Sequence, residues 1–93
     1  MSYRIQYHTL VASIDIPALP HEWRRRIRYA IEERLTEHPE VHGKPLRMSL
    51  KGYRKFRVGD YRVIFRIEQS TVKIFVIQHR SRVYESAEKR LRP

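Results

Sequence analysis

The 93-residue sequence contains no cysteine, which excludes a disulfide framework, a thiolate nucleophile and a zinc–thiolate site. No stretch of it reaches the roughly 18 apolar residues of a membrane span, and its first residues lack the pattern of a secretory signal. We therefore expect a soluble, cytoplasmic protein from a reducing compartment, with no membrane partner. The length predicts one domain over residues 1–93 with a single modest core.

Acidic residues are scarce in one half of the chain. Residues 1–43 hold six basic and six acidic side chains, so the whole net charge of +10 lies in residues 44–93. The acids of that second half are Asp60, Glu68, Glu85 and Glu88. Such one-sided charge favours a nucleic-acid partner, because each phosphate neutralised by Lys or Arg releases counterions. The alternative is a charge that serves only solubility.

Metal chemistry is also disfavoured. A two-metal nuclease needs several carboxylates that converge on the cations, and the acids of the basic half are few and scattered. The five histidines lack metal-ligand spacing, and no glycine-rich phosphate loop is present. We therefore expect neither a metal site nor a cofactor.

The apolar periodicity predicts an α+β fold. Helical spacing of Trp23, Ile27 and Ile31 indicates a helix over 20–38, while segment 9–20 is ambiguous because Pro17 disfavours a continuing helix. A short C-terminal helix follows residue 81, with Ser81 as its N-cap. Alternation predicts strands over 3–7, 46–50, 53–58, 61–68 and 71–79. The expected fold is a small, mostly antiparallel, four- to five-stranded sheet with N-terminal helices packed on one face and a short C-terminal helix.

The segment "YRKFRVGDYRVIFRIE", residues 53–68, reads as a hairpin around a tight turn at Gly59 and Asp60. Side chains two apart on a strand share a face. If the apolar rows meet the helices, the uncovered face gathers Lys55, Arg57, Arg62 and Arg66. Like charges on neighbouring strands destabilise a sheet, so this cluster favours a polyanion over the alternative of a solvated face.

RNA is the polyanion that these side chains could cut. It supplies its own nucleophile, the 2′-hydroxyl beside each phosphate. A site then needs to orient that hydroxyl, take its proton, stabilise the phosphorane and protonate the 5′-oxygen. Arg, Lys, Tyr and His can share those tasks. The residue set therefore suits a metal-independent ribonuclease.

The segment "QHRSRVYESAEKR" places His79, Arg80 and Tyr84 at a strand-to-helix junction. For Tyr84 the functional interpretation is base stacking or proton transfer, and the alternative is a core position, since it shares helical spacing with Ala87. For His79 the alternative is a strand-end side chain satisfied by the backbone. Arg80 or Arg82 could instead bridge to an acid of the helix.

The segment "KPLRMSLKGYRKFRVGDYRVIFRIEQSTVKIFVIQHRSRVYESAEKR" resembles the RelE/ParE toxin superfamily, specifically the RelE-like messenger-RNA interferases. The "HPE…GKPL" loop, the "RVGDYRVIF" hairpin and the "HRSRVY" junction carry the resemblance. It implies a type II toxin that enters the ribosomal A site, where it lies against 16S rRNA, and cuts the bound mRNA. It also implies a small cognate antitoxin as partner. We expect the isolated chain to be a monomer.

Carried over by position, the resemblance implies phosphate binding and transition-state stabilisation by Arg62 and Arg80. Tyr84 would stack on the nucleotide or handle the 2′-hydroxyl proton, and Lys55 or His79 would act as general base or acid. Further RNA contacts would come from Arg57, Arg66, Arg54 and Arg82. Some members carry two lysines in the strand before the turn, where this chain has Tyr53 and Lys55.

Two other interpretations remain open at this point. A ParE-like toxin would poison DNA gyrase by binding alone, on the same fold. A degenerate member would survive only as an antitoxin-binding partner. The set Arg62, His79, Arg80 and Tyr84 favours RNA cleavage, because it has no evident purpose in gyrase inhibition.

Overall fold

A computed structural model of the chain describes residues 2–92 and confirms the α+β class. Five strands form one sheet in the order β1-β5-β4-β3-β2, with β1 parallel to β5 and the other neighbours antiparallel. The strands are β1 (Arg4–Tyr7), β2 (Lys44–Pro45), β3 (Arg54–Val58), β4 (Tyr61–Glu68) and β5 (Thr71–His79). The two long central strands, β4 and β5, therefore carry the sheet.

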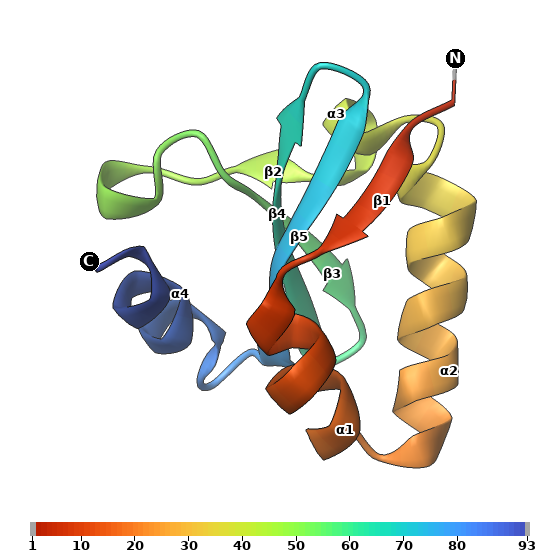
Figure 1. The fold of residues 1–93 in the computed structure, drawn as a ribbon, viewed down its shortest axis with the longest axis vertical. Helices are drawn as coiled ribbons and strands as arrows, with labels where there is room; N and C mark the ends of the chain where they lie inside the picture. The colour runs from red at the N-terminus through yellow and green to blue at the C-terminus, as the bar shows by residue number, and fades with distance from the viewer. Residues whose placement is uncertain (1, 93) are drawn as a thin grey trace.

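Helices cover both faces of this sheet (Figure 1). The helix α2 (His21–Ala30) continues as a π-helical segment, Ile31–Leu35, and the short α3 (Pro39–His42) follows. A π-helical segment, Val11–Asp15, leads into α1 (Ile16–Ala18). On the other side of the sheet lies α4 (Val83–Leu91). We call the two sides the α2 face and the α4 face.

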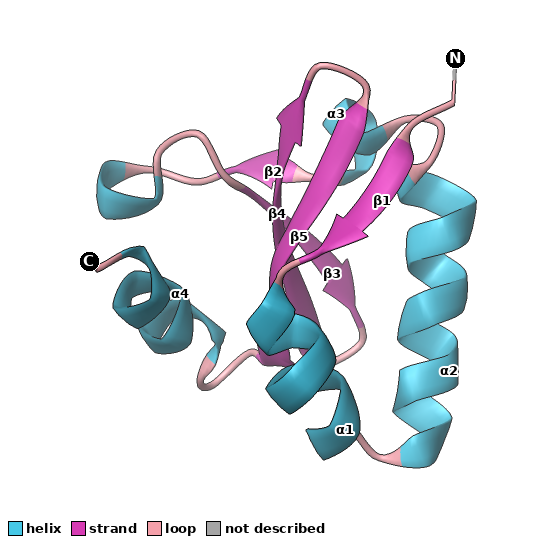
Figure 2. Cartoon of the chain, in the orientation of Figure 1, coloured by secondary structure: helices cyan, strands magenta, loops and turns pink. Residues whose placement is uncertain are grey.

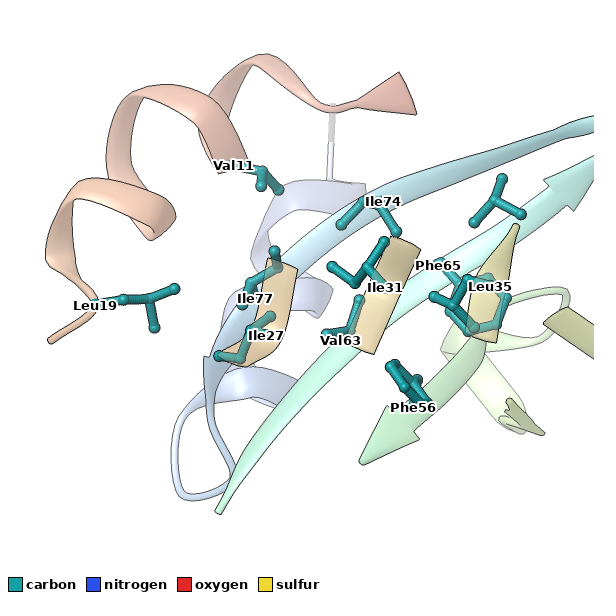
Figure 3. Packing of buried hydrophobic residues seen from close by; sticks show 11 residues of the cluster. Val11, Leu19, Ile27, Ile31, Leu35, Phe56, Val63, Phe65, Ile74 and Ile77 are labelled. Atoms are coloured by element: carbon teal, nitrogen blue, oxygen red, sulfur yellow. The ribbon is translucent and has the colours of Figure 1, made fainter. Parts of the chain in front are cut away.

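The α2 face holds the larger core. Ile27, Ile31 and Leu35 recur at helical spacing and are at most 2% exposed. Figure 3 shows them against the sheet residues of the same cluster. Those sheet residues are Phe56, Val63, Phe65, Val72, Ile74 and Ile77. The predicted packing of the long helix on the apolar rows is confirmed.

The α4 face has its own, smaller core. Ile64 of β4 and Val76 of β5 pair across the sheet and are fully buried beneath Val83 and Ala87 of α4. Leu50, in the 3₁₀ turn Met48–Leu50, closes this cluster. The prediction that one face stays uncovered is therefore wrong, because α4 and this turn seal the middle of the second face.

The hairpin turn between β3 and β4 is the predicted tight turn. Val58 pairs with Tyr61, and Gly59 adopts a φ of 60° in the left-handed region. A Cβ at residue 59 would also lie 2.7 Å from Cζ3 of Trp23. The glycine thus serves both the turn and the approach of α2.

Two local predictions are wrong. Residues 46–50 do not form a strand: the strand is limited to β2, and Figure 2 shows a loop with a helical turn after it. Ser81 is not the N-cap of α4; Arg82 holds that position, and the Ser81 hydroxyl lies 2.9 Å from Nδ1 of His79. In segment 9–20, which the sequence left ambiguous, α1 runs through Pro17 to Ala18. Across residues 2–92, no helix is both long and apolar enough to traverse a bilayer.

Candidate functional site

Three basic side chains form a row on the α4 face. Residues that pair directly across antiparallel strands share a face, and Arg57 pairs with Arg62 while Lys55 pairs with the buried Ile64. We call Lys55, Arg57 and Arg62 the basic row. The structure thus groups side chains from two strands on one face, as the alternation predicts. Ile64, the buried residue opposite Lys55, is covered by α4.

No acid neutralises the basic row. Within residues 2–92, none of its three members forms an ion pair. Arg57 and Arg62 stand directly opposite each other, an arrangement that destabilises a sheet. By contrast, Arg66 lies further along β4 and pairs with Glu68. The unpaired end of the face is therefore the end near the Gly59 turn.

The Arg62 guanidinium is held in place by the hairpin turn. Its Nη1 donates to the carbonyl oxygens of Gly59 and Tyr61, each at 2.9 Å. A guanidinium has five N–H groups, and these two bonds leave three. Arg62 is therefore an oriented cation with donors to spare, which suits phosphate binding.

Tyr84 lies on the same face as the basic row. It is half-buried on α4 and packs against the cluster that contains Ile64 and Val76. Since Ile64 is two residues from Arg62 and pairs with Lys55, Tyr84 packs on a cluster that borders these cations. Tyr84 is thus a partly buried core position, and its role in a site stays a prediction.

Arg80 lies at the edge of this site, beside the hairpin turn. Its backbone N–H donates to the carbonyl of Asp60 at 2.8 Å, and its Nε is 3.8 Å from the Asp60 carboxylate. Both side chains are mostly exposed, at 63% and 66%. A pair of this kind contributes little and leaves Arg80 able to turn toward a ligand.

His79 and Arg82 face away from the basic row. His79 pairs with Tyr61, whose ring it meets edge-on at 5.6 Å, and Tyr61 in turn packs on Trp23 of α2. His79 therefore belongs to the α2 face. Arg82 lines a hollow with it beside Leu19. The structure separates these two residues from Lys55, Arg62 and Tyr84.

Arg54 is also on the α2 face, since it pairs with Phe65. Its Nη1 donates to the carbonyl of Gly43 at 2.9 Å and to that of Glu40 at 3.3 Å. The guanidinium thus satisfies the last carbonyls of α3 and its loop. Its place in the structure is that of a loop anchor.

The sequence reasoning missed a buried network that fastens α4 to the sheet. Asp15 is fully buried and receives two hydrogen bonds from Arg90, at 2.7 and 2.8 Å. It also accepts from the backbone N–H of Ile77 and from Gln78, which in turn accepts from Ser86 of α4. Because β1 ends at Tyr7, this carboxylate replaces a strand partner at the β5 edge. The network positions the helix that carries Tyr84.

A signal for this network existed in the sequence. Asp15 is the lone acid of the apolar segment "VASIDIPAL", and an isolated carboxylate among apolar residues is typical of a buried, paired group. The partner of Asp15 could not be identified from the sequence, because Arg90 lies 75 residues away. As for metals, residues 2–92 bring no three His, Asp or Glu side chains together as ligands.

Comparisons with known proteins agree on the family. The family model described as "ParE toxin of type II toxin-antitoxin system, parDE" matches residues 4–84. Toxin RelG of Mycobacterium tuberculosis is 37% identical over 90 residues, covering 90% of this chain and 98% of that protein. Toxin RelE of the same organism is 35% identical over 83 residues, covering 84% of this chain and 86% of that protein.

Solved structures agree on the fold. The toxin–antitoxin complex RelBE2 from Mycobacterium tuberculosis matches with a TM-score of 0.80 and 30% identity, covering 87% of this chain and 94% of that one. A mutant of Escherichia coli toxin RelE in the free state matches with a TM-score of 0.74 and 20% identity, covering 99% of this chain and 100% of that one. The chain therefore belongs to the RelE/ParE family of toxins from type II toxin–antitoxin systems, and it is RelE-like, as the resemblance implied.

Proposed function

We propose that this toxin is a metal-independent endoribonuclease that cuts mRNA in the ribosomal A site and so stops translation. The observation that carries the proposal is the basic row, three cations without an acidic partner beside the half-buried phenol of Tyr84. A sheet surface that keeps Arg57 opposite Arg62 loses stability unless an anion lies against it. The phosphates of RNA supply that anion.

The proposed reaction begins with attack of the 2′-hydroxyl oxygen on the adjacent phosphorus. Water takes the hydroxyl proton, while the Lys55 ammonium delivers a proton to the 5′-oxygen as the P–O5′ bond breaks and recovers it from solvent. The products are a 2′,3′-cyclic phosphate and a 5′-hydroxyl, so atoms and charge balance. Arg62, anchored by the turn, and Arg80, from the junction, stabilise the charge on the phosphorane. Tyr84 orients the nucleotide.

We further propose a cognate antitoxin as partner. Support comes from RelBE2 of Mycobacterium tuberculosis, whose structure is that of a toxin–antitoxin complex and which is 30% identical to this chain. Poisoning of DNA gyrase is the second candidate function, because the family model that matches residues 4–84 is that of a ParE toxin.

The test compares two assays on the same purified protein. In primer extension on a translating message, we expect cuts at fixed codon positions, lost in Arg62→Ala and strongly reduced in Tyr84→Phe. In gyrase supercoiling, we expect no inhibition. The matched control is Arg25→Ala, which removes an exposed arginine of α2 and is expected to cut normally. Intact messages together with inhibited supercoiling would reverse the assignment.

A further inference from the structure

A hollow of about 320 Å³ opens on the α4 face, away from the basic row. Arg66 of β4 and Lys73 of β5 line it from the sheet, at the end where these strands join through the Gln69–Ser70 turn. Tyr53, just before β3, and Gln6 of β1 line its sides. This volume is sufficient for a single nucleotide-sized group, and no role described above uses it.

One wall of this hollow is aromatic. The rings of Tyr53 and Phe75 lie 5.0 Å apart at an interplanar angle of 35°, and the His8 ring meets Phe75 edge-on at 5.4 Å. Tyr53 and Phe75 are half-buried and His8 is exposed, so each ring keeps surface open to the hollow. Partly exposed rings of this kind provide stacking surfaces for nucleobases.

The other wall is cationic, and one acidic side chain pairs with both of its cations. The Arg66 guanidinium lies 5.6 Å from the Tyr53 ring centre, and Arg66 pairs with Lys73 across the two strands. Glu68 forms ion pairs with both cations, at 2.7 Å from Lys73. The Lys73 hydrogen bond, with Arg66 beside it, holds the pKa of Glu68 below its ordinary value. Its carboxylate thus competes with a phosphate for these two cations, although each cation keeps further N–H donors.

We propose that this hollow binds one nucleotide of single-stranded RNA, with its base on Tyr53 and Phe75 and its phosphate at Arg66 and Lys73. Gln6 offers an amide to the edge of the base. Tyr53, just before β3, precedes Lys55 by two residues on the same face, a step of about 7 Å. The bound nucleotide is therefore a neighbour of the one that is cut. That last point rests on the proposed ribonuclease function, while nucleotide binding itself does not.

Binding is measured directly by NMR titration with each nucleoside 5′-monophosphate, following the His8 ring signals. Inorganic phosphate serves as the probe without a base and is expected to bind at least about tenfold more weakly. Tyr53→Leu keeps the apolar packing but removes the ring, and it should weaken nucleotide binding by roughly tenfold. Tyr53→Phe keeps the ring and should retain most of the affinity. Equal affinity of Tyr53→Leu and the parent protein would overturn the proposal.

Binding of the phosphate is tested with a variant that should raise the affinity for nucleotide instead of lowering it. Glu68→Gln releases Arg66 and Lys73 from their carboxylate, so it should tighten nucleotide binding by on the order of threefold. The matched control is Glu85→Gln, which removes an exposed acid of α4 and should leave affinity unchanged. If Glu68→Gln binds no better than the control, the two cations do not hold the phosphate.

Cleavage assays then separate this inference from the proposed function. If Arg62→Ala stops cleavage but still binds nucleotide, both stand, and Tyr53→Leu should shift the preference for the base next to the cut. If nucleotide binds and no message is ever cut, the hollow stands and the ribonuclease function fails. If messages are cut but Tyr53→Leu changes neither binding nor base preference, the hollow fails alone.

Discussion

The α2 face and the α4 face of one sheet are covered in different ways. On the α2 face, Ile27, Ile31 and Leu35 form a continuous apolar row in contact with the sheet. On the α4 face, only the middle is sealed, by Val83 and Ala87, and charged side chains remain at both ends. The difference shows that this small protein gains most of its apolar burial on one face, which leaves the other free to hold cations.

The two ends of the α4 face differ again. At the end near the Gln69–Ser70 turn, Glu68 neutralises Arg66 and Lys73. At the end near the Gly59 turn, Arg57 and Arg62 face each other without an acid. A carboxylate paired with a cation lowers the affinity of that cation for phosphate. In the described part of the chain, Asp60 of the Gly59 turn pairs only with the exposed Arg80, so Arg57 and Arg62 remain the cations most available to an anion.

The largest predicted effect concerns the link between the two faces. Asp15→Asn leaves Arg90, whose side chain is 9% exposed, without its counter-charge and should lower the free energy of unfolding by about 3–5 kcal/mol. Urea unfolding followed by circular dichroism measures it. Glu22→Gln, which breaks the exposed pair with Arg26, is the control and should change stability by no more than about 0.5 kcal/mol. Similar losses in both variants would contradict the role of the buried pair.

The next effect tests which face stabilises the fold. Ile31→Ala on the α2 face should cost about 2–5 kcal/mol, because Ile31 is 1% exposed within the larger cluster. Leu50→Ala, at the rim of the α4 cluster and 6% exposed, should cost less, since its site can collapse or admit water. Both are measured by denaturant unfolding. A larger loss for Leu50→Ala would reverse the comparison.

A smaller effect has the opposite sign. Arg57→Gln removes a like charge opposite Arg62 and should raise stability by about 0.2–1 kcal/mol. The same variant should bind RNA less tightly and with a weaker dependence on salt, since one phosphate contact is lost. Thermal unfolding and RNA binding at several salt concentrations check the two parts. If Arg57→Gln raises the stability no more than the control Arg25→Gln does, Arg57 and Arg62 do not repel each other.

The smallest effect is a pH dependence on the α2 face. Burial, assisted by the Glu32 carboxylate, raises the pKa of Tyr7 above its ordinary value of 10.0. A raised folded-state pKa gives stability that is full below pH 10 and is lost as pH rises through the folded value. Tyr7→Phe should therefore unfold with less alkaline loss than the parent protein, in urea titrations on either side of pH 10. Tyr29→Phe, at a side chain 67% exposed, is the control.

Much of the fold could be predicted because local pattern and tertiary environment agree. Strands 61–68 and 71–79 match β4 and β5 in full, since both alternate or run apolar and pair from end to end apart from a bulge at Phe75. Segment 46–50 also looks apolar and alternating, but pairing with β3 stops at Pro45, and Met48 takes a φ of 57°. Leu50 gains its burial by turning over the α4 face instead.

The site could be predicted only as far as strand periodicity reaches. Two-residue spacing groups Arg57 with Lys55, which the register bears out. Arg54, expected from the resemblance to contact RNA, lies on the opposite face. The junction carries no such periodicity, so the sequence could not tell that His79 turns toward Tyr61 and away from Arg62. The Asp15–Arg90 bond spans 75 residues and depends on the whole fold.

That span has a consequence for synthesis. A chain made from its N-terminus exposes Asp15 long before Arg90 exists, and 75 residues must be added before the carboxylate can meet its cation. Closing so long a loop also carries an entropic cost that shorter contacts do not. The helix that carries Tyr84 therefore cannot be fastened to Asp15 until almost the whole chain has been made.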